Sequence, residues 1–193
     1  MKPKNFLRKE LEIRNGNYCM RGAVLIPKHI SKRIPAILVV HGWNSNIDRY
    51  FKRVELLAQS GYAVFLCNLR GHGTSDGTLQ DYSRNDHLQD IYSMYQYISG
   101  LPYIDSSRIG ALGKSYGGYL VSILSAKIPF TAICITAPAL YSNTGMDTPT
   151  FTVIKNDIDA FRHSDEDPKI NIALNSISKY SHPRLLVICS KDE

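Results

Sequence analysis

Short runs of unbroken apolar residues constrain the fold of this chain more than any other feature. Such runs, rich in Val, Ile and Leu and without polar alternation, are typical of parallel strands that are covered on both faces. They therefore predict a central sheet that is buried on both sides. The runs are AILVV (36–40), YAVFLC (62–67), RIGAL (108–112), FTAICITA (130–137) and RLLVICS (184–190).

Helical patterns separate these runs. Residues 47–60 and 84–99 carry apolar side chains at three- and four-residue spacing, and Gly61 supplies a stop for the first of them. Residues 116–128 are apolar on almost all sides, as expected of a helix buried against the middle of a sheet. Strand and helix alternate, which predicts an α/β fold with a mostly parallel central sheet and helices on both faces.

Two segments lie outside this alternation of strands and helices, and each predicts a further structural element beside the parallel sheet. ELEIR and YCMRGAVLIP are joined at Asn15-Gly16, a pair that readily adopts a hairpin turn, so we expect an antiparallel N-terminal hairpin. Residues 140–180 are polar, include SDEDPK, and hold one modest helical pattern near 170–180. We interpret them as a small cap insertion within a single domain of residues 1–193.

Composition and charge narrow the function classes. The formal net charge of +6 is spread along the chain, and no basic stripe interleaved with aromatic residues indicates nucleic-acid binding. No apolar run approaches the roughly 20 residues that span a bilayer, and no secretory signal follows the N-terminal lysines. We expect a cytoplasmic protein. The cysteines lie in apolar segments without paired spacing, as buried free thiols do; they are Cys19, Cys67, Cys134 and Cys189.

The segment ALGKSYGGYL (111–120) places a serine in a G-x-S-x-G pattern between a predicted strand and a predicted helix. A nucleophilic serine in this context sits on a sharp, strained turn, so that its hydroxyl projects above the edge of the sheet. The neighbouring residues must be small because strand and helix backbones pass close by, and the helix N-terminus favours developing negative charge. The pattern predicts Ser115 as a nucleophile; a tight turn with an idle serine is the alternative.

Acyl transfer also requires two preorganised donors for the oxyanion that develops. The N–H of Tyr116, the residue after the nucleophile, is the first candidate. The N–H of Trp43, in LVVHGWNSN, is the second, because Gly42 lets the backbone fold inward. We interpret His41 as a hydrogen-bonding residue that orders this loop rather than as the catalytic base, and NLRGHGTSDG (68–77) as a rigid loop beside the site.

The order of these motifs resembles that of the α/β-hydrolase superfamily, in particular its small serine-esterase and acyl-hydrolase branch. The resemblance rests on HGWNSN, LRGHGTSDG, SSRIGALGKSYGGYL and LLVICSKDE, and it runs from about residue 20 to the last residue. KSYGGYL is also similar to the nucleophile segment of the prolyl-oligopeptidase family. That family generally has a Tyr-Gly-Gly-Pro-like segment at the oxyanion loop, where this chain has His-Gly-Trp.

The resemblance implies an acid after the strand RLLVICS, where Asp192 would orient a histidine and stabilise its charged form. In this superfamily the histidine follows the acid in the chain, and none follows Asp192 here. We therefore expect a C-terminally truncated, poorly active hydrolase that lacks the catalytic histidine, the last strand and the last helix. RLLVICS would then be an exposed edge, open to self-association. The six histidines are His29, His41, His72, His87, His163 and His182.

Three functions stay open at this point. The first is a serine hydrolase that cleaves a carboxylic ester or related acyl bond of a small molecule through an acyl-serine intermediate, with no metal or organic cofactor. The second, favoured by SYGGY, is an aminopeptidase-like serine peptidase. The third, favoured only by the missing histidine, is a non-catalytic binding protein on the same fold.

Overall fold

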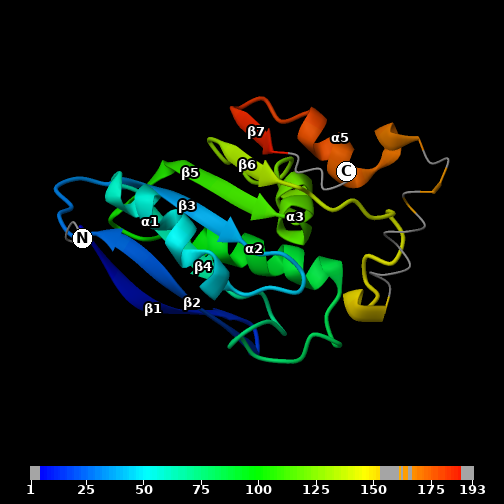
Figure 1. Cartoon of the computed structure of the whole chain (residues 1–193), viewed down its shortest axis with the longest axis horizontal. Helices are drawn as coiled ribbons and strands as arrows, with labels where there is room; N and C mark the ends of the chain where they lie inside the picture. Colours follow the sequence, from blue (N-terminus) through cyan, green and yellow to red (C-terminus); the bar gives the residue numbers. More distant parts are fainter. Residues whose placement is uncertain (1–4, 153–160, 162, 165–166, 188–193) are drawn as a thin grey trace.

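A computed structural model of the chain describes residues 5–152, 161, 163–164 and 167–187. Seven strands form one sheet in the order β1-β2-β4-β3-β5-β6-β7 (Figure 1). The predicted acid Asp192, its neighbour Glu193 and Cys189 lie outside the described residues. Cys19 and Cys67 are buried free thiols, as the sequence predicts, whereas Cys134 is a free thiol that is only partly buried.

The N-terminal hairpin is present as predicted. Strand β1 (Phe6–Asn15) pairs antiparallel with β2 (Tyr18–Pro27), and Gly16 takes a positive φ of 61° in the turn between them. Strand β2 in turn pairs antiparallel with β4 (Ala63–Cys67), which joins the hairpin to the rest of the sheet.

The remaining strands run parallel, which confirms the interpretation of the apolar runs. They are β3 (Ile34–Val40), β4, β5 (Ile104–Lys114), β6 (Ile133–Thr136) and β7 (Arg184–Val187). Because the strands are parallel, the loops that follow β3, β5 and β6 emerge at one edge of the sheet. Ligands of open α/β sheets bind at this edge.

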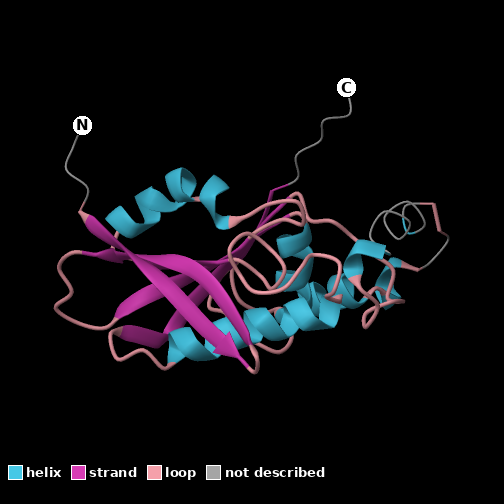
Figure 2. Cartoon of the chain, turned by 90° about the horizontal axis from the view of Figure 1, so that it is seen from below, coloured by secondary structure: helices cyan, strands magenta, loops and turns pink. Residues whose placement is uncertain are grey.

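Helices cover both faces of the sheet (Figure 2). On one face, α1 (Phe51–Gln59), which follows the 3-10 turn η1 (Ile47–Arg49), packs its residues Val54 and Ala58 in one cluster with Val39 and Val64 of the sheet. The opposite face packs against α2 (Arg84–Ser99) and α3 (Tyr116–Leu124). The side chains of each strand thus alternate between two apolar layers, which explains the unbroken apolar runs.

The segment after β6 contains η2 (Pro168–Ile170) and α5 (Ile172–Ser178). Asn171 caps α5 by accepting hydrogen bonds from Ala173 N and Leu174 N. The single-domain interpretation and the cap insertion at about 140–180 stay predictions. Among the described residues, no helix is both long enough and apolar enough to cross a membrane.

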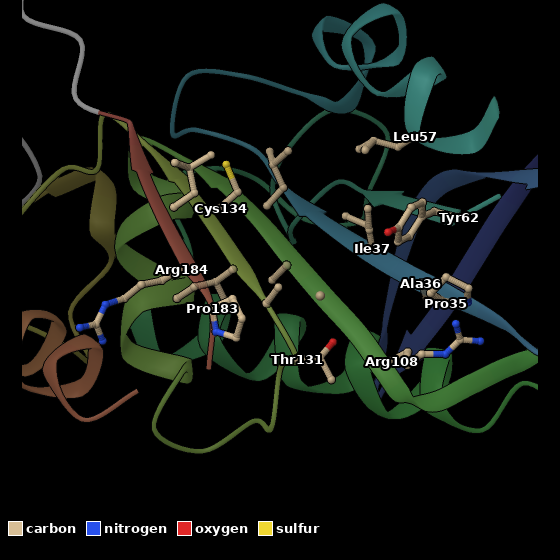
Figure 3. Close-up of a pocket in the computed structure, with 16 residues that line it drawn as sticks. Pro35, Ala36, Ile37, Leu57, Tyr62, Arg108, Thr131, Cys134, Pro183 and Arg184 are labelled. Carbon is tan, nitrogen blue, oxygen red and sulfur yellow. The ribbon is translucent and has the colours of Figure 1, made fainter. Parts of the chain in front are cut away.

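Strand β7 is the last strand of the described sheet, and all four of its residues are exposed. Leu185 is 58% exposed and Leu186 55%. On the α1 side, residues of β3, β5, β6 and β7 line a largely apolar cleft of about 710 Å³ (Figure 3). The opposite edge strand β1 differs, because exposed charged side chains such as Lys9 and Glu10 discourage pairing there.

This contrast leads to a prediction about self-association. We expect the chain to associate with increasing concentration and Leu186→Lys to weaken that association, because a charge on an edge strand opposes pairing between copies. Sedimentation velocity over a hundredfold concentration range measures the effect. Leu56→Lys is the matched control, since Leu56 is 69% exposed but lies on α1. A monomer at every concentration, or an equal effect of both variants, contradicts the prediction.

Candidate active site

Ser115 occupies a strained turn between β5 and α3. Its φ of 52° and ψ of −117° lie outside the regions that non-glycine residues ordinarily adopt. Such a conformation persists only where its surroundings hold it. Here the Ser115 N–H donates to Thr136 O at 2.9 Å, and Ser115 O accepts from Tyr119 N at 3.0 Å and Ala139 N at 3.2 Å. Strand β6, the segment that follows it and helix α3 therefore hold the turn.

Glycines make this turn sterically possible, as the sequence predicts. A Cβ atom at Gly117 would lie 2.3 Å from Val40 O and 2.5 Å from His41 O. A Cβ at Gly113 would lie 2.6 Å from Gly117 O. Backbone atoms of β3, β5 and α3 thus approach one another more closely than any side chain allows.

The Ser115 side chain opens onto a cleft. Ser115 is partly exposed and lines a cavity of about 1260 Å³. Four parts of the chain line this cavity: the loop after β3, η1 with α1, the end of β5, and the segment after β6. The lining residues include Trp43, Ser45, Arg49, Arg53, Lys114, Pro138, Leu140, Phe151 and Phe161.

The loop after β3 lies directly against the serine. A Cβ atom at Gly42 would be 3.5 Å from Ser115 Cβ, so the Gly42–Trp43 backbone borders the nucleophile turn. Gly42 N donates to the Tyr50 hydroxyl at 3.2 Å, which anchors the loop to the start of α1. Within the described part of the chain, neither the Trp43 N–H nor the Tyr116 N–H donates a hydrogen bond. Both N–H groups can therefore donate to an oxyanion that forms at Ser115.

His41 orders this loop, as the sequence predicts. Leu69 N donates to His41 Nε2 at 3.1 Å, so Nδ1 carries the proton and donates to Gly42 O at 2.8 Å. The Gly42 carbonyl and the Trp43 N–H belong to the same trans peptide and point in opposite directions. By holding the carbonyl, His41 fixes the direction of the Trp43 N–H.

His87 and His72 contact the residues that flank Ser115 and the loop after β3. His87 accepts from the Tyr116 hydroxyl at Nδ1 (2.8 Å) and donates from Nε2 to Arg70 O (3.2 Å). His72 makes a contact of 3.1 Å between Nδ1 and Arg70 O. The rings of Trp43 and Tyr116 pack edge-to-face at 5.2 Å, and the Trp43 and His72 rings at 5.3 Å. This packing fixes the Tyr116 and Trp43 side chains.

Burial keeps these imidazoles neutral. Desolvation, with the neighbouring His72, lowers the pKa of His41 from its ordinary 6.5 to about 3. Desolvation also lowers the pKa of His72 and, far more strongly, that of His87. Neither His41 nor His87 is a proton acceptor for Ser115, because their ring nitrogens already bond to other groups.

These pKa values predict acid sensitivity. Below about pH 6.5 the unfolded chain binds a proton on His41 that the folded chain does not bind until about pH 3. Stability therefore falls as the pH drops through this window, by about 2 kcal/mol at pH 5 for His41 alone. Urea unfolding at several pH values between 7 and 5 measures the slope of the free energy of unfolding against pH. His29→Gln should leave it unchanged, since His29 is exposed. A constant or rising free energy of unfolding contradicts the prediction.

The loop at 68–77 has the structural role predicted for it. The Arg70 guanidinium forms ion pairs with Asp90 at 2.7 Å and with Asp86 at 3.1 Å, which tie the loop to α2. Asp76 accepts from Cys19 N at 3.0 Å and pairs with Arg21 of the hairpin. None of these charged groups lines the cleft.

No histidine among the described residues forms a hydrogen bond with Ser115. His182 precedes β7, whereas Ser115 follows β5, and the two positions lie at opposite ends of parallel strands. The predicted role of Asp192 falls outside the described residues.

Several residues of the cleft have no recognisable signal in the sequence. Arg49 ends the 3-10 turn η1 and Arg53 lies in the first turn of α1, and no sequence pattern indicates that both line the cleft. Lys114 occupies the variable position before Ser115 in the serine motif, which predicts no role for its side chain. No local signal marks Ala137, which lines the cleft with a positive φ of 42°.

The chain is similar to proteins of more than one hydrolase class. It is 34% identical over 95 residues to the uncharacterized peptidase YuxL of Bacillus subtilis, which covers 46% of this chain and 14% of YuxL. It is 25% identical over 126 residues to a monoacylglycerol lipase of Mycolicibacterium smegmatis, covering 62% of this chain and 43% of the lipase. The chain thus spans less than half the length of these curated relatives.

A solved structure shares the fold. An esterase of Pyrococcus furiosus superposes with a TM-score of 0.69 at 19% sequence identity, over 94% of this chain and 70% of the esterase. Residues 31–183 match the family model described as serine aminopeptidase, S33. That range contains the loop after β3, the nucleophile turn and the cleft. The chain therefore belongs to the serine aminopeptidase S33 family of α/β hydrolases.

Proposed function

We propose that this chain is a serine hydrolase that cleaves a carboxylic ester or related acyl bond. The observation that carries the proposal is Ser115, held at a φ of 52° and opening onto a cavity of about 1260 Å³ beside the backbone of Gly42 and Trp43. A serine hydroxyl in this position is suited to attack a carbonyl carbon within the cleft.

In the proposed reaction, Ser115 Oγ bonds to the carbonyl carbon and its proton passes to a base. The carbonyl oxygen becomes an oxyanion that accepts from the Trp43 and Tyr116 N–H groups. Collapse of this intermediate breaks the bond to the leaving alcohol, which takes up the proton, and water later releases the acyl group from the serine. Asp192 would orient the imidazole that acts as base. The proposal assigns the base to none of the described histidines.

An aminopeptidase-like activity is the second candidate, and the similarity to YuxL favours it. An aminopeptidase holds the protonated amine of its substrate next to the scissile bond, which calls for a carboxylate partner. Among the described lining residues there is no Asp or Glu, whereas Arg49, Arg53 and Lys114 are cationic. This charge favours ester or acyl substrates over peptides with a free amine.

Hydrolysis of 4-nitrophenyl butyrate and of leucine 4-nitroanilide distinguishes these candidates. We expect the protein, as expressed from its gene, to accelerate ester hydrolysis at least a hundredfold more than anilide hydrolysis, each relative to its rate in buffer. A larger acceleration of the anilide supports the peptidase instead. Turnover of neither substrate, with ligand binding intact, supports a non-catalytic binding protein.

A further inference from the structure

The cleft around Ser115 carries a concentrated positive charge. Arg49 and Arg53 enter its lining from η1 and α1, and Lys114 enters from the end of β5, next to the nucleophile. Of the described lining residues, none is acidic. Arg49 and Arg53 are exposed and Lys114 is partly exposed, and cations gathered in this way attract anions, most strongly at low ionic strength.

These cations lack protein counter-charges in the part of the chain that the structure describes. None of the three takes part in an ion pair, although other arginines of this chain are paired. Arg70, for example, is neutralised by Asp86 and Asp90. The charge of Arg70 is thus satisfied within the fold. The two arginines and the lysine of the cleft instead leave their charge available to a ligand.

Apolar and aromatic residues form much of the remaining lining, beside the polar Asn44, Ser45 and Thr152. The described residues that the segment after β6 contributes carry no charge, and Trp43 adds a large ring from the loop after β3. A ligand that fills this space therefore needs an apolar body as well as an anionic group. The contributing residues of the segment are Pro138, Leu140, Phe151 and Phe161.

We infer that the substrate of this cleft carries a carboxylate on an apolar acyl or alcohol part, and that Arg49 and Arg53 bind this carboxylate. Arginine suits the role because its planar guanidinium donates two parallel hydrogen bonds to a carboxylate. The inference rests on the proposed function, since it names the substrate class of the same cleft. It goes beyond that function in requiring a negative charge on the substrate away from the reacting carbonyl.

Trp43 makes the inference testable without catalysis. It is the only tryptophan of the chain and lines the cleft, so its fluorescence reports binding there directly. The ligands are 4-phenylbutyrate and its neutral amide, 4-phenylbutyramide, titrated at low ionic strength. We expect the carboxylate to bind at least about fivefold more tightly than the amide, and the difference to shrink in 0.5 M NaCl.

Two double variants that remove the same number of positive charges distinguish an effect of the cleft arginines on binding from an effect of the overall net charge. Arg49→Gln/Arg53→Gln should abolish the preference for the carboxylate. Lys28→Gln/Lys52→Gln, which removes two cations outside the cleft, should keep it. Ser115→Ala should also keep it, so loss of hydrolysis and loss of anion binding are distinguishable. Equal binding of the two ligands, binding of neither, or an equal loss in both double variants overturns the inference.

Discussion

Ser115→Ala is expected to abolish covalent labelling by a fluorophosphonate probe of the protein as expressed from its gene. Where that protein supplies the base that the described residues lack, ester turnover should fall by up to about a millionfold. That is the scale of loss when the nucleophile of a serine triad is removed. The fold should stay intact, because alanine meets the same backbone restriction as serine at a φ of 52°. The Ser115 hydroxyl also forms no hydrogen bond with another described residue. Labelling intensity and thermal unfolding of both proteins measure the two effects.

Ser45→Ala is the matched control for this experiment. Ser45 lines the same cleft, and its hydroxyl bonds only weakly to Asn46 O at 3.4 Å. It is not on a strained turn, and we expect its removal to leave labelling within about twofold of the parent. Equal labelling of the parent and Ser115→Ala refutes the assignment of the nucleophile.

Gly117→Ala is expected to remove activity by a different route, through the backbone. The new Cβ would lie 2.3 Å from Val40 O and 2.5 Å from His41 O, a distance that only a backbone shift relieves. Overpacking of this kind costs about 3 kcal/mol when backbone atoms must move. The shift displaces the loop that carries the Trp43 N–H, so labelling of Ser115 should fall together with stability.

Gly100→Ala controls for the loss of a glycine as such. Gly100 has a φ of −81°, and a Cβ there meets nothing closer than 3.5 Å. We expect its free energy of unfolding to change by less than about 0.5 kcal/mol. Urea unfolding of both variants provides the comparison. A Gly117→Ala protein as stable and as reactive as the parent contradicts the close approach of β3 and α3.

The sheet was predictable because its strands are buried on both faces, although the strand ends were not. Strand β5 extends to Ile104, four residues before the apolar run RIGAL, and its extra residues Asp105 to Ser107 are partly or fully exposed. Conversely, Phe130 is fully buried but precedes β6, which begins at Ile133. Apolar runs report burial, whereas strand ends depend on backbone pairing.

The candidate site was predictable where its chemistry is local in the sequence. Ser115, Tyr116 and the flanking glycines lie within one turn, so their spacing alone indicates their geometry. Arg49 and Arg53 lie more than sixty residues before Ser115 in the sequence. They line the same cleft as Ser115 because β3 and β5 are parallel neighbours in the sheet. Their convergence is a property of the topology, which residue spacing does not reveal. Asp192 stays a prediction.

Mass spectrometry of the peptides from fluorophosphonate-treated protein tests the central assignment most directly. We expect one adduct, on the peptide that contains Ser115, and no adduct after Ser115→Ala. An adduct on another serine of the cleft, or ester turnover without any adduct on Ser115, would contradict it.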